Sequence, residues 1–224
     1  KSNLSGVLDY EYKPDFNEAK VQKPLTFKGY KRAYGKVGIR NEIWIVNTVG
    51  CVNKVAQRLS EKTGARYFPH PFGCSQLGDD MNMTLKYLSG LINHPNAAAV
   101  LVVGLGCENG NIEELKKVLG NFDENRVKFL VAQDSEDEIL DGTKIIESLA
   151  KYADTFKRET CPASELVIGL KCGGSDGFSG ITANPLLGSL SDRIIGMGGS
   201  AILTEVPEMF GAETILMNRC RTEN

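Results

Sequence analysis

The sequence lacks three features that point to particular partners: an excess of basic charge, a long apolar run and a cysteine-dense segment. Its 224 residues carry 26 Lys and Arg against 28 Asp and Glu, a net charge of −2. Binding nucleic acid by neutralising phosphates needs a basic surface, which excludes that class. The longest apolar run, around residues 97–105, is well short of the roughly 18–20 residues that cross a bilayer, so we expect no membrane partner.

The six cysteines form no CxxC pair and have none of the spacings of zinc fingers or ferredoxins. Residues 1–23 are polar and contain no apolar stretch of the kind found in signal peptides. Disulfide-rich proteins are mostly secreted, so this cysteine usage favours a reduced setting. These absences predict a cytoplasmic protein.

Glycine is abundant, at 24 of 224 residues. Apolar, β-branched segments alternate with segments whose apolar residues recur every three or four positions, which predicts an α/β fold with a parallel sheet in Rossmann-like or flavodoxin-like layers. The predicted strands cover residues 42–49, 66–69, 98–104, 127–132, 165–170 and 201–204. The predicted helices cover residues 52–62, 77–91, 112–119, 135–152 (interrupted at Gly142) and 185–195, and Pro207 begins another.

The pattern divides the chain into three parts. Residues 1–30 are polar and aperiodic, which is typical of an extension or linker. Residues 31–158 carry most of the alternation and form the predicted α/β domain. Residues 159–224 hold about two strands, which is short for a domain, so we expect the start of a second α/β domain that is truncated.

Four turns that follow predicted strands combine glycine, cysteine and polar residues. They are residues 49–51, 70–76, 104–109 and 171–177. The carboxyl ends of parallel strands face the ligand crevice of an open α/β sheet. Glycine allows close backbone approach to a ligand, and successive N–H groups there bind anions. The turns therefore predict one convergent site for an anionic ligand.

A few side chains in these turns carry chemistry. His70 is suited to binding a divalent metal or moving a proton. Glu108 and Asp176 offer oxygen ligands, and Lys171 can neutralise an acidic substrate or a developing enolate. Each has a plainer interpretation as a solvated loop residue. For Cys51, Cys74, Cys107 and Cys172 the plainer interpretation is a small buried hydrophobe.

Three segments in this order carry a specific resemblance: His70-x-x-Gly73-Cys74, Gly104-Leu105-Gly106-Cys107-Glu108-Asn109, and the run from Cys172 to Pro185 that begins Cys-Gly-Gly-Ser-Asp-Gly. With further matches between about residues 25 and 219, the chain resembles the central part of the large catalytic region of the altronate dehydratase/galactarate dehydratase family. Dinucleotide binding is disfavoured, because Asn109 stands where the third glycine of that fingerprint belongs.

The resemblance implies a metal-dependent hydro-lyase that uses iron(II) or manganese(II). Such an enzyme eliminates water from a sugar acid, such as altronate or galactarate, to give a 2-keto-3-deoxy acid. Family members usually carry an additional SAF-type domain and continue beyond the equivalent of residue 224. We therefore expect this chain to be a fragment whose partners are the SAF-type domain or subunit and the remaining C-terminal region. A homo-oligomer is compatible with the sequence.

The resemblance and the local chemistry together suggest roles. His70, Lys171 and Asp176 are the predicted catalytic residues, and His70 and Glu108 the predicted metal ligands. The predicted substrate-binding residues are Gly73, Cys74, Gly106, Cys107, Asn109, Gly173, Gly174 and Ser175.

Three other functions stay open at this point. One is a non-catalytic module that binds a sugar acid or another anion. Another is a subunit of a sulfolactate sulfo-lyase type. The third is an iron–sulfur hydro-lyase with Cys51, Cys107 and Cys172 as cluster ligands.

Overall fold

The structure is a computed structural model that describes residues 10–15, 20–174, 176–205 and 211–222. It divides the chain into two compact units, of which the larger spans residues 28–161. The smaller unit combines residues 1–27 with residues 162–224.

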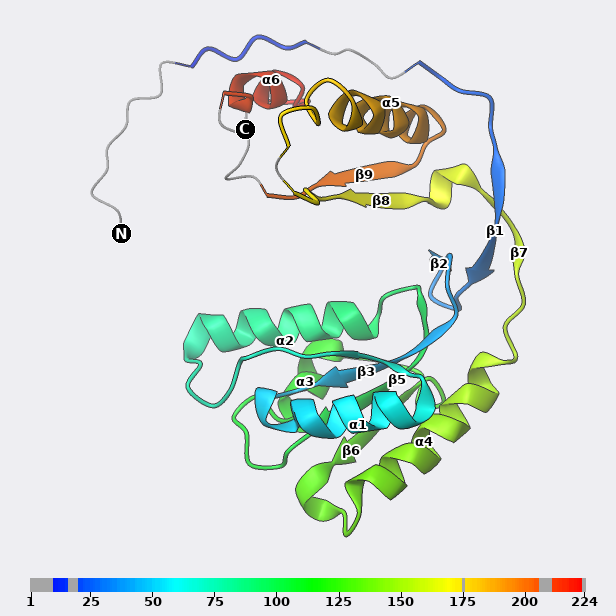
Figure 1. The fold of residues 1–224 in the computed structure, drawn as a ribbon, viewed down its shortest axis with the longest axis vertical. Helices are drawn as coiled ribbons and strands as arrows, with labels where there is room; N and C mark the ends of the chain where they lie inside the picture. The colour runs from blue at the N-terminus through cyan, green and yellow to red at the C-terminus, as the bar shows by residue number, and fades with distance from the viewer. Residues whose placement is uncertain (1–9, 16–19, 175, 206–210, 223–224) are drawn as a thin grey trace. The chain divides into compact units, whose positions relative to one another are not determined.

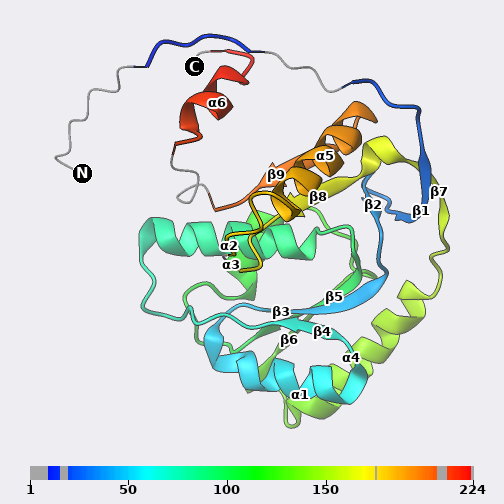
Figure 2. The ribbon, with the colours of Figure 1, turned by 45° about the horizontal axis from the view of Figure 1, so that its top comes forward.

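The larger unit is built on a four-stranded parallel sheet of order β4-β3-β5-β6 (Figure 2). Its strands are β3 (Glu42–Asn47), β4 (Arg66–Phe68), β5 (Ala97–Gly104) and β6 (Val127–Val131). Helices separate successive strands, and the order matches a flavodoxin-like sheet. The predicted α/β class is confirmed.

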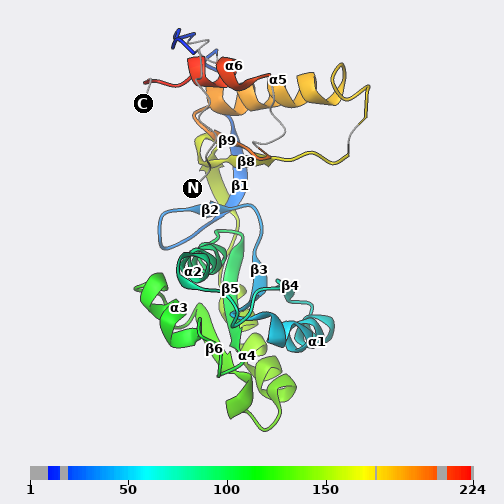
Figure 3. The same ribbon diagram turned by 90° about the vertical axis from the view of Figure 1, so that its left-hand side faces the viewer.

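Helices cover both faces of this sheet (Figure 3). α2 (Gly78–Ile92) and α3 (Ile112–Leu119) pack on one face. α1 (Asn53–Thr63) and α4 (Glu138–Ala153) pack on the other. Helix α1 ends at Gly64, which adopts a left-handed φ of 77°, as its place after the last periodic residue predicts.

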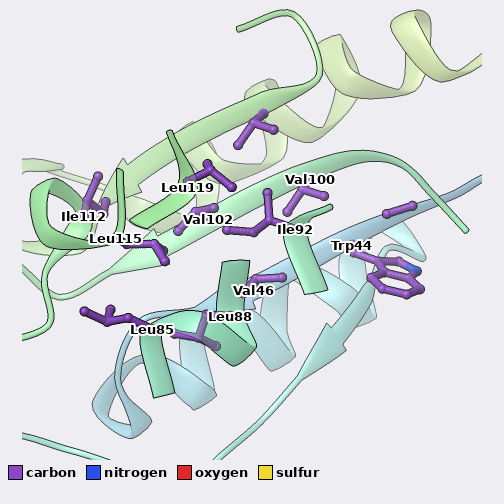
Figure 4. Close-up of a cluster of buried hydrophobic side chains, with 12 residues drawn as sticks. Trp44, Val46, Leu85, Leu88, Ile92, Val100, Val102, Ile112, Leu115 and Leu119 are labelled. Atoms are coloured by element: carbon purple, nitrogen blue, oxygen red, sulfur yellow. The ribbon is translucent and has the colours of Figure 1, made fainter. Parts of the chain in front are cut away.

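The central strand β5 is buried along its whole length. Because side chains alternate along a strand, Val100 and Val102 face α2 and α3 (Figure 4). Leu101 and Val103 face α1 and α4. A strand buried on both faces has a continuous apolar run instead of alternating residues, and that run predicted this strand.

Two sequence expectations about local structure were wrong. Gly142 does not interrupt its helix but packs against Leu59, at a distance where an added Cβ would come within 2.7 Å of a leucine methyl carbon. The helix begins at Glu138, because the Asp137 carboxylate accepts hydrogen bonds from the N–H groups of residues 139 and 140.

Three short strands were not predicted. They are β1 (Thr26–Lys31), β2 (Val37–Gly38) and β7 (Glu159–Pro162), which form a sheet of order β2-β1-β7. β1 and β7 are mostly polar and β2 has only two residues, so these strands lack the apolar alternation that predicts strands. The described residues also form three short 3-10 helices, at Gly50–Val52, Ala132–Asp134 and Ala163–Glu165.

The smaller unit contains two parallel strands, β8 (Val167–Leu170) and β9 (Ser200–Leu203). The connecting helix α5 (Ala183–Gly196) lies over them, and a short helix α6 (Glu213–Asn218) follows (Figure 1). Ile194 is the buried residue of α5. Pro207, predicted to begin a helix, lies outside the described residues.

Within the described parts of the chain, no helix has both the length and the apolar character of a membrane span.

Candidate functional site

Three of the four predicted turns meet at the carboxyl edge of the four-stranded sheet. From β3 the chain crosses to β4 on one side, whereas β5 and then β6 lie on the other side. The strand order therefore reverses between β3 and β5, and such a switch point leaves a crevice where ligands bind in open α/β sheets. The turns after β3, β4 and β5 surround this point.

Hydrogen bonds between two asparagines and a histidine join the first two turns. The Asn47 amide donates to Oδ1 of Asn53 at 2.8 Å. The Asn53 amide donates to the backbone oxygen of His70 at 2.9 Å. Asn47 is fully buried at the end of β3, so this chain of bonds fixes the turn after β4 against the central strands.

The ring of His70 is held in one tautomer. Its Nε2 lies 3.0 Å from the backbone oxygen of Asn47. Because a carbonyl oxygen only accepts, Nε2 must carry the proton, and Nδ1 of the neutral ring is left as an acceptor. Nδ1 is buried and has no partner among the described residues.

Gly50 permits close approach of the turn that carries His70. Its N–H donates to the backbone oxygen of Phe72 at 2.7 Å. A Cβ at this position would lie 2.9 Å from the His70 carbonyl oxygen, closer than real Cβ contacts come. The turns after β3 and β4 can therefore touch only if residue 50 is glycine.

We expect Gly50→Ala to displace the turn at residues 70–72 and to lower the stability of the larger unit by about 1–3 kcal/mol. Urea unfolding followed by the fluorescence of Trp44, the single tryptophan, measures this change. Gly73→Ala is the matched control, because an added Cβ there meets nothing within 4 Å among the described residues. Equal stability of the two variants would contradict the close contact.

Glu108 is buried in the third turn, with 4% of its surface exposed. Its Oε1 accepts a hydrogen bond from the Thr48 hydroxyl at 2.6 Å and one from the Leu105 N–H at 3.0 Å. Its Oε2 accepts from the Gly106 N–H at 2.6 Å. Burial by itself raises the pKa of Glu108, but these hydrogen bonds and one from its own N–H outweigh burial and hold the pKa below its ordinary value.

The ionised Glu108 thus organises its own turn and ties it to the end of β3. The neighbouring Cys107 and Asn109 are exposed. The Asn109 amide donates to the backbone oxygen of Cys74 at 3.2 Å, which joins the turns after β4 and β5. Cys51, Cys74, Cys107 and Cys172 are all exposed, so their interpretation as small buried hydrophobes was wrong.

The cavity between these turns is small. Polar groups of Thr48, Gln76, Thr84, Glu108 and Asn109 contribute to its wall, and its volume is about 20 Å³. That volume suits a single water molecule. In this arrangement, the hollow is too small for a sugar acid.

The predicted metal ligands of the larger unit do not fit a metal ion in this arrangement. Both oxygens of Glu108 accept hydrogen bonds from donors of its own unit and Nε2 of His70 donates to Asn47, which leaves, within the described residues, the buried Nδ1 of His70 as the single open donor atom of the pair. In the part of the chain that the structure describes, no three His, Cys, Asp or Glu side chains are grouped to hold an ion. Metal binding stays a prediction.

The fourth predicted turn lies in the smaller unit, where it borders a larger hollow of about 1190 Å³. Because this turn belongs to a different unit from the other three, convergence of all four turns stays a prediction. The predicted residues that line this hollow are Lys171, Cys172, Gly173, Gly174 and Asp176. The predicted Ser175 lies outside the described residues.

Asp176 shapes the far end of this turn. Its Oδ1 accepts a hydrogen bond from the Phe178 N–H at 2.8 Å, and its backbone oxygen accepts one from the Ser179 hydroxyl at 2.7 Å. This local turn is typical of Asp before a helix. The residue is exposed on the cavity side, so its carboxylate is available to a ligand there.

Sequence reasoning missed the polar face of α5 and a cation near α6. Asn184, Ser191 and Asp192 line the hollow from α5, and Arg219 lines it after α6. Residues 184, 188, 191, 192 and 195 recur at helical spacing, so they share one face. Ser189 and Arg193 of the same helix are also polar but do not line the hollow, so the sequence offers no signal that separates the lining residues from the rest.

Comparison with known proteins agrees with the resemblance found in the motifs. Residues 29–154 match the profile of "D-galactarate dehydratase/Altronate hydrolase, second domain". Residues 163–224 match "D-galactarate/Altronate dehydratase, C-terminal". The chain belongs to the D-galactarate dehydratase/altronate hydrolase family.

Curated relatives align with 90–100% of the chain. It is 52% identical to the altronate dehydratase of Bacillus subtilis, over all of this chain and 47% of that protein. It is 47% identical to the altronate dehydratase of Escherichia coli, over all of this chain and 48% of that protein. A (2R)-sulfolactate sulfo-lyase subunit beta of Chromohalobacter salexigens is 31% identical, over 90% of this chain and 52% of that protein. The chain thus spans about half the length of the curated relatives it matches.

Proposed function

We propose that this chain forms part of a sugar-acid dehydratase that eliminates water from a hexonate or hexarate to give a 2-keto-3-deoxy acid. The observation that carries the proposal is the hollow of the smaller unit, where Lys171, Asp176 and a glycine-rich turn line the same wall. An elimination beside a carboxylate needs a cation, N–H donors and a group that moves a proton, and these residues offer all three. Altronate dehydratases are also among the chain's relatives.

The reaction breaks the C2–H and C3–O bonds of the substrate. A base removes the proton from C2, the electron pair forms the C2=C3 double bond, and the C3 hydroxyl leaves as water after protonation. The resulting enol takes up a proton at C3 and becomes the 2-keto acid. Negative charge develops on the carboxylate as C2 loses its proton, so a nearby cation and N–H donors lower the barrier.

We assign these tasks to residues around the hollow. The Lys171 ammonium binds the carboxylate and stabilises the charge that develops on it. The N–H groups of Gly173 and Gly174 are further donors, because neither residue carries a side chain that blocks approach. The Asp176 carboxylate moves a proton. His70, predicted to share in proton transfer, lies in the larger unit and keeps that role as a prediction.

The function is tested on the complete polypeptide that carries this chain. It is incubated anaerobically with altronate, other hexonates, galactarate and sulfolactate, with and without added iron(II) or manganese(II). Formation of a 2-keto-3-deoxy acid from one sugar acid is the expected result, and loss of turnover on chelation would support the predicted metal.

Other results of this assay would contradict the dehydratase proposal. Substrate binding without turnover at any metal concentration identifies a non-catalytic binding module. Release of sulfite from sulfolactate, with no sugar-acid turnover, identifies a sulfo-lyase. Visible absorbance that is lost together with activity on oxidation identifies an iron–sulfur enzyme. The predicted SAF-type partner and homo-oligomer are tested by the mass of the purified particle.

A further inference from the structure

The backbone at Glu205 is strained. Its φ of 62° is the left-handed value that glycine tolerates and a residue with a long side chain rarely adopts. It is the one non-glycine residue with positive φ among those that the structure describes. Such strain persists only where surrounding contacts hold it, and it is concentrated at functional positions.

Two contacts of the Glu205 carboxylate account for this conformation. Its Oε1 lies 2.6 Å from Nζ of Lys171. Its Oε2 accepts a hydrogen bond from the backbone N–H of Cys172 at 2.9 Å. One carboxylate therefore holds both the side chain of Lys171 and the backbone where the glycine-rich turn begins.

The strand pairing explains how these groups meet. Leu170 and Leu203 are partners in the parallel pair β8–β9. The next residue, Thr204, donates to the Leu170 backbone oxygen through its N–H at 3.2 Å and its hydroxyl at 2.8 Å. Both strands thus end in register, and the left-handed turn at Glu205 brings its side chain to the residues that follow β8.

The two partners differ in exposure. The side chain of Glu205 is 27% exposed, whereas that of Lys171 is 71% exposed and lines the hollow. An exposed lysine samples many rotamers unless a partner holds it. The hydrogen bond from Lys171, followed by that from Cys172, holds the pKa of Glu205 below its ordinary value, so the carboxylate stays ionised near neutral pH.

We propose that Glu205 is a positioning residue for the dehydration, which holds the Lys171 ammonium at the wall of the hollow and fixes the start of the glycine-rich turn. The inference rests on the proposed function, because it assigns Glu205 its effect through Lys171. In this role Glu205 acts through Lys171 and the turn, without touching the substrate.

A double-mutant cycle in the complete polypeptide tests the inference. Lys171→Met, Glu205→Gln and the double variant are compared by kcat and KM on the substrate that the panel identifies. Glu205→Gln keeps an acceptor for the Cys172 N–H but loses the charge that holds Lys171. We expect it to lower kcat about 10–100-fold, and the double variant to be no slower than Lys171→Met.

Glu213→Gln is the matched control. The Glu213 carboxylate accepts a hydrogen bond from the Gly211 N–H at 2.7 Å in the same unit, and Glu213 is not among the residues that line the hollow. We expect its kcat to equal that of the unchanged protein. Glu205→Gly adds a measurement of folding. Glycine tolerates the left-handed φ, so we expect an unchanged or higher Tm, whereas kcat falls because the carboxylate that holds Lys171 is lost. A lower Tm with unchanged kcat would assign Glu205 a purely structural role and overturn the inference.

Other outcomes separate the two proposals. Full activity of Lys171→Met contradicts the role of Lys171 in the proposed function, and the inference falls with it. If Lys171→Met is impaired but Glu205→Gln is not, or if the two losses multiply in the double variant, the inference alone is wrong. A lower KM of Glu205→Gln with unchanged kcat would show that Glu205 competes with the substrate carboxylate, which also overturns the inference.

Discussion

Lys171→Met is expected to lower kcat/KM of the complete enzyme about 10²–10³-fold, because it removes the cation that we place beside the developing enediolate. Methionine has similar length and no charge, so the cavity wall keeps its shape. The loss is expected mainly in kcat, since the charge on the substrate carboxylate grows as C2 loses its proton. Steady-state kinetics on the identified substrate measures both constants.

The control for this substitution is Lys144→Met. Lys144 is also an exposed lysine in an ion pair, with Asp141 at 3.3 Å, but it lies on α4 of the larger unit. We expect activity there to be unchanged, because exposed ion pairs contribute little. Full activity of both variants would remove Lys171 from the mechanism. An equal loss in both would mean that the loss reflects a general effect of lysine removal.

Glu108→Ala is expected to reduce the free energy of unfolding of the larger unit by about 3 kcal/mol. The substitution removes the acceptor of the Leu105 and Gly106 N–H groups and leaves the Thr48 hydroxyl with only its longer hydrogen bond to the Val103 backbone oxygen, at 3.4 Å. Buried donors that lose their partner cost about 1–3 kcal/mol each, and some relax toward water. Trp44 lies in β3 and is buried, so its fluorescence during urea unfolding reports on this unit.

The same carboxylate predicts a pH dependence of stability. The folded state holds the pKa of Glu108 below its ordinary value, so the unfolded state binds the proton more readily. The contribution of Glu108 is therefore fully present above the unfolded pKa of about 4.3 and is lost as pH falls through the lower folded pKa. The stability of Glu108→Ala should fall less steeply than that of the unchanged chain over this acidic range.

Glu113→Ala is the control for both measurements. Glu113 is an exposed glutamate nearby on α3, paired with Lys116 at 2.8 Å. Its removal should change stability by about 0.5 kcal/mol or less. If Glu108→Ala were as mild as this control and instead abolished metal binding by the complete enzyme, Glu108 would be a ligand rather than the organiser of its turn.

Much of the larger unit was predictable because its elements are defined locally. The run of apolar residues at 97–104 is long enough to identify a strand that is buried on both faces, and Gly64 and Gly120 follow the last periodic residues of α1 and α3. Strands β1, β2 and β7 were missed, because β2 is only two residues long and β1 pairs with β7 from more than 100 residues away, so neither pairing leaves a periodic signal.

The candidate site was predictable as a set of turns but not as a set of contacts. Glycine-rich turns after strands identify the carboxyl edge of a sheet, and residues 171–174 do line the large hollow. The cavity-lining residues Asn184 and Arg219 are single polar residues far apart in sequence. No local pattern distinguishes them from solvated ones.

By itself, the sequence determined the α/β class, the family and the positions of the turns, because hydrophobic periodicity and ordered motifs are local properties. Only the tertiary structure decided what the ionisable residues contact. Glu108 is engaged by donors that β3 and its own turn bring together, and Glu205 reaches Lys171 because β8 and β9 end in register. Such partnerships depend on strand order, register and backbone φ, which residue spacing alone does not specify.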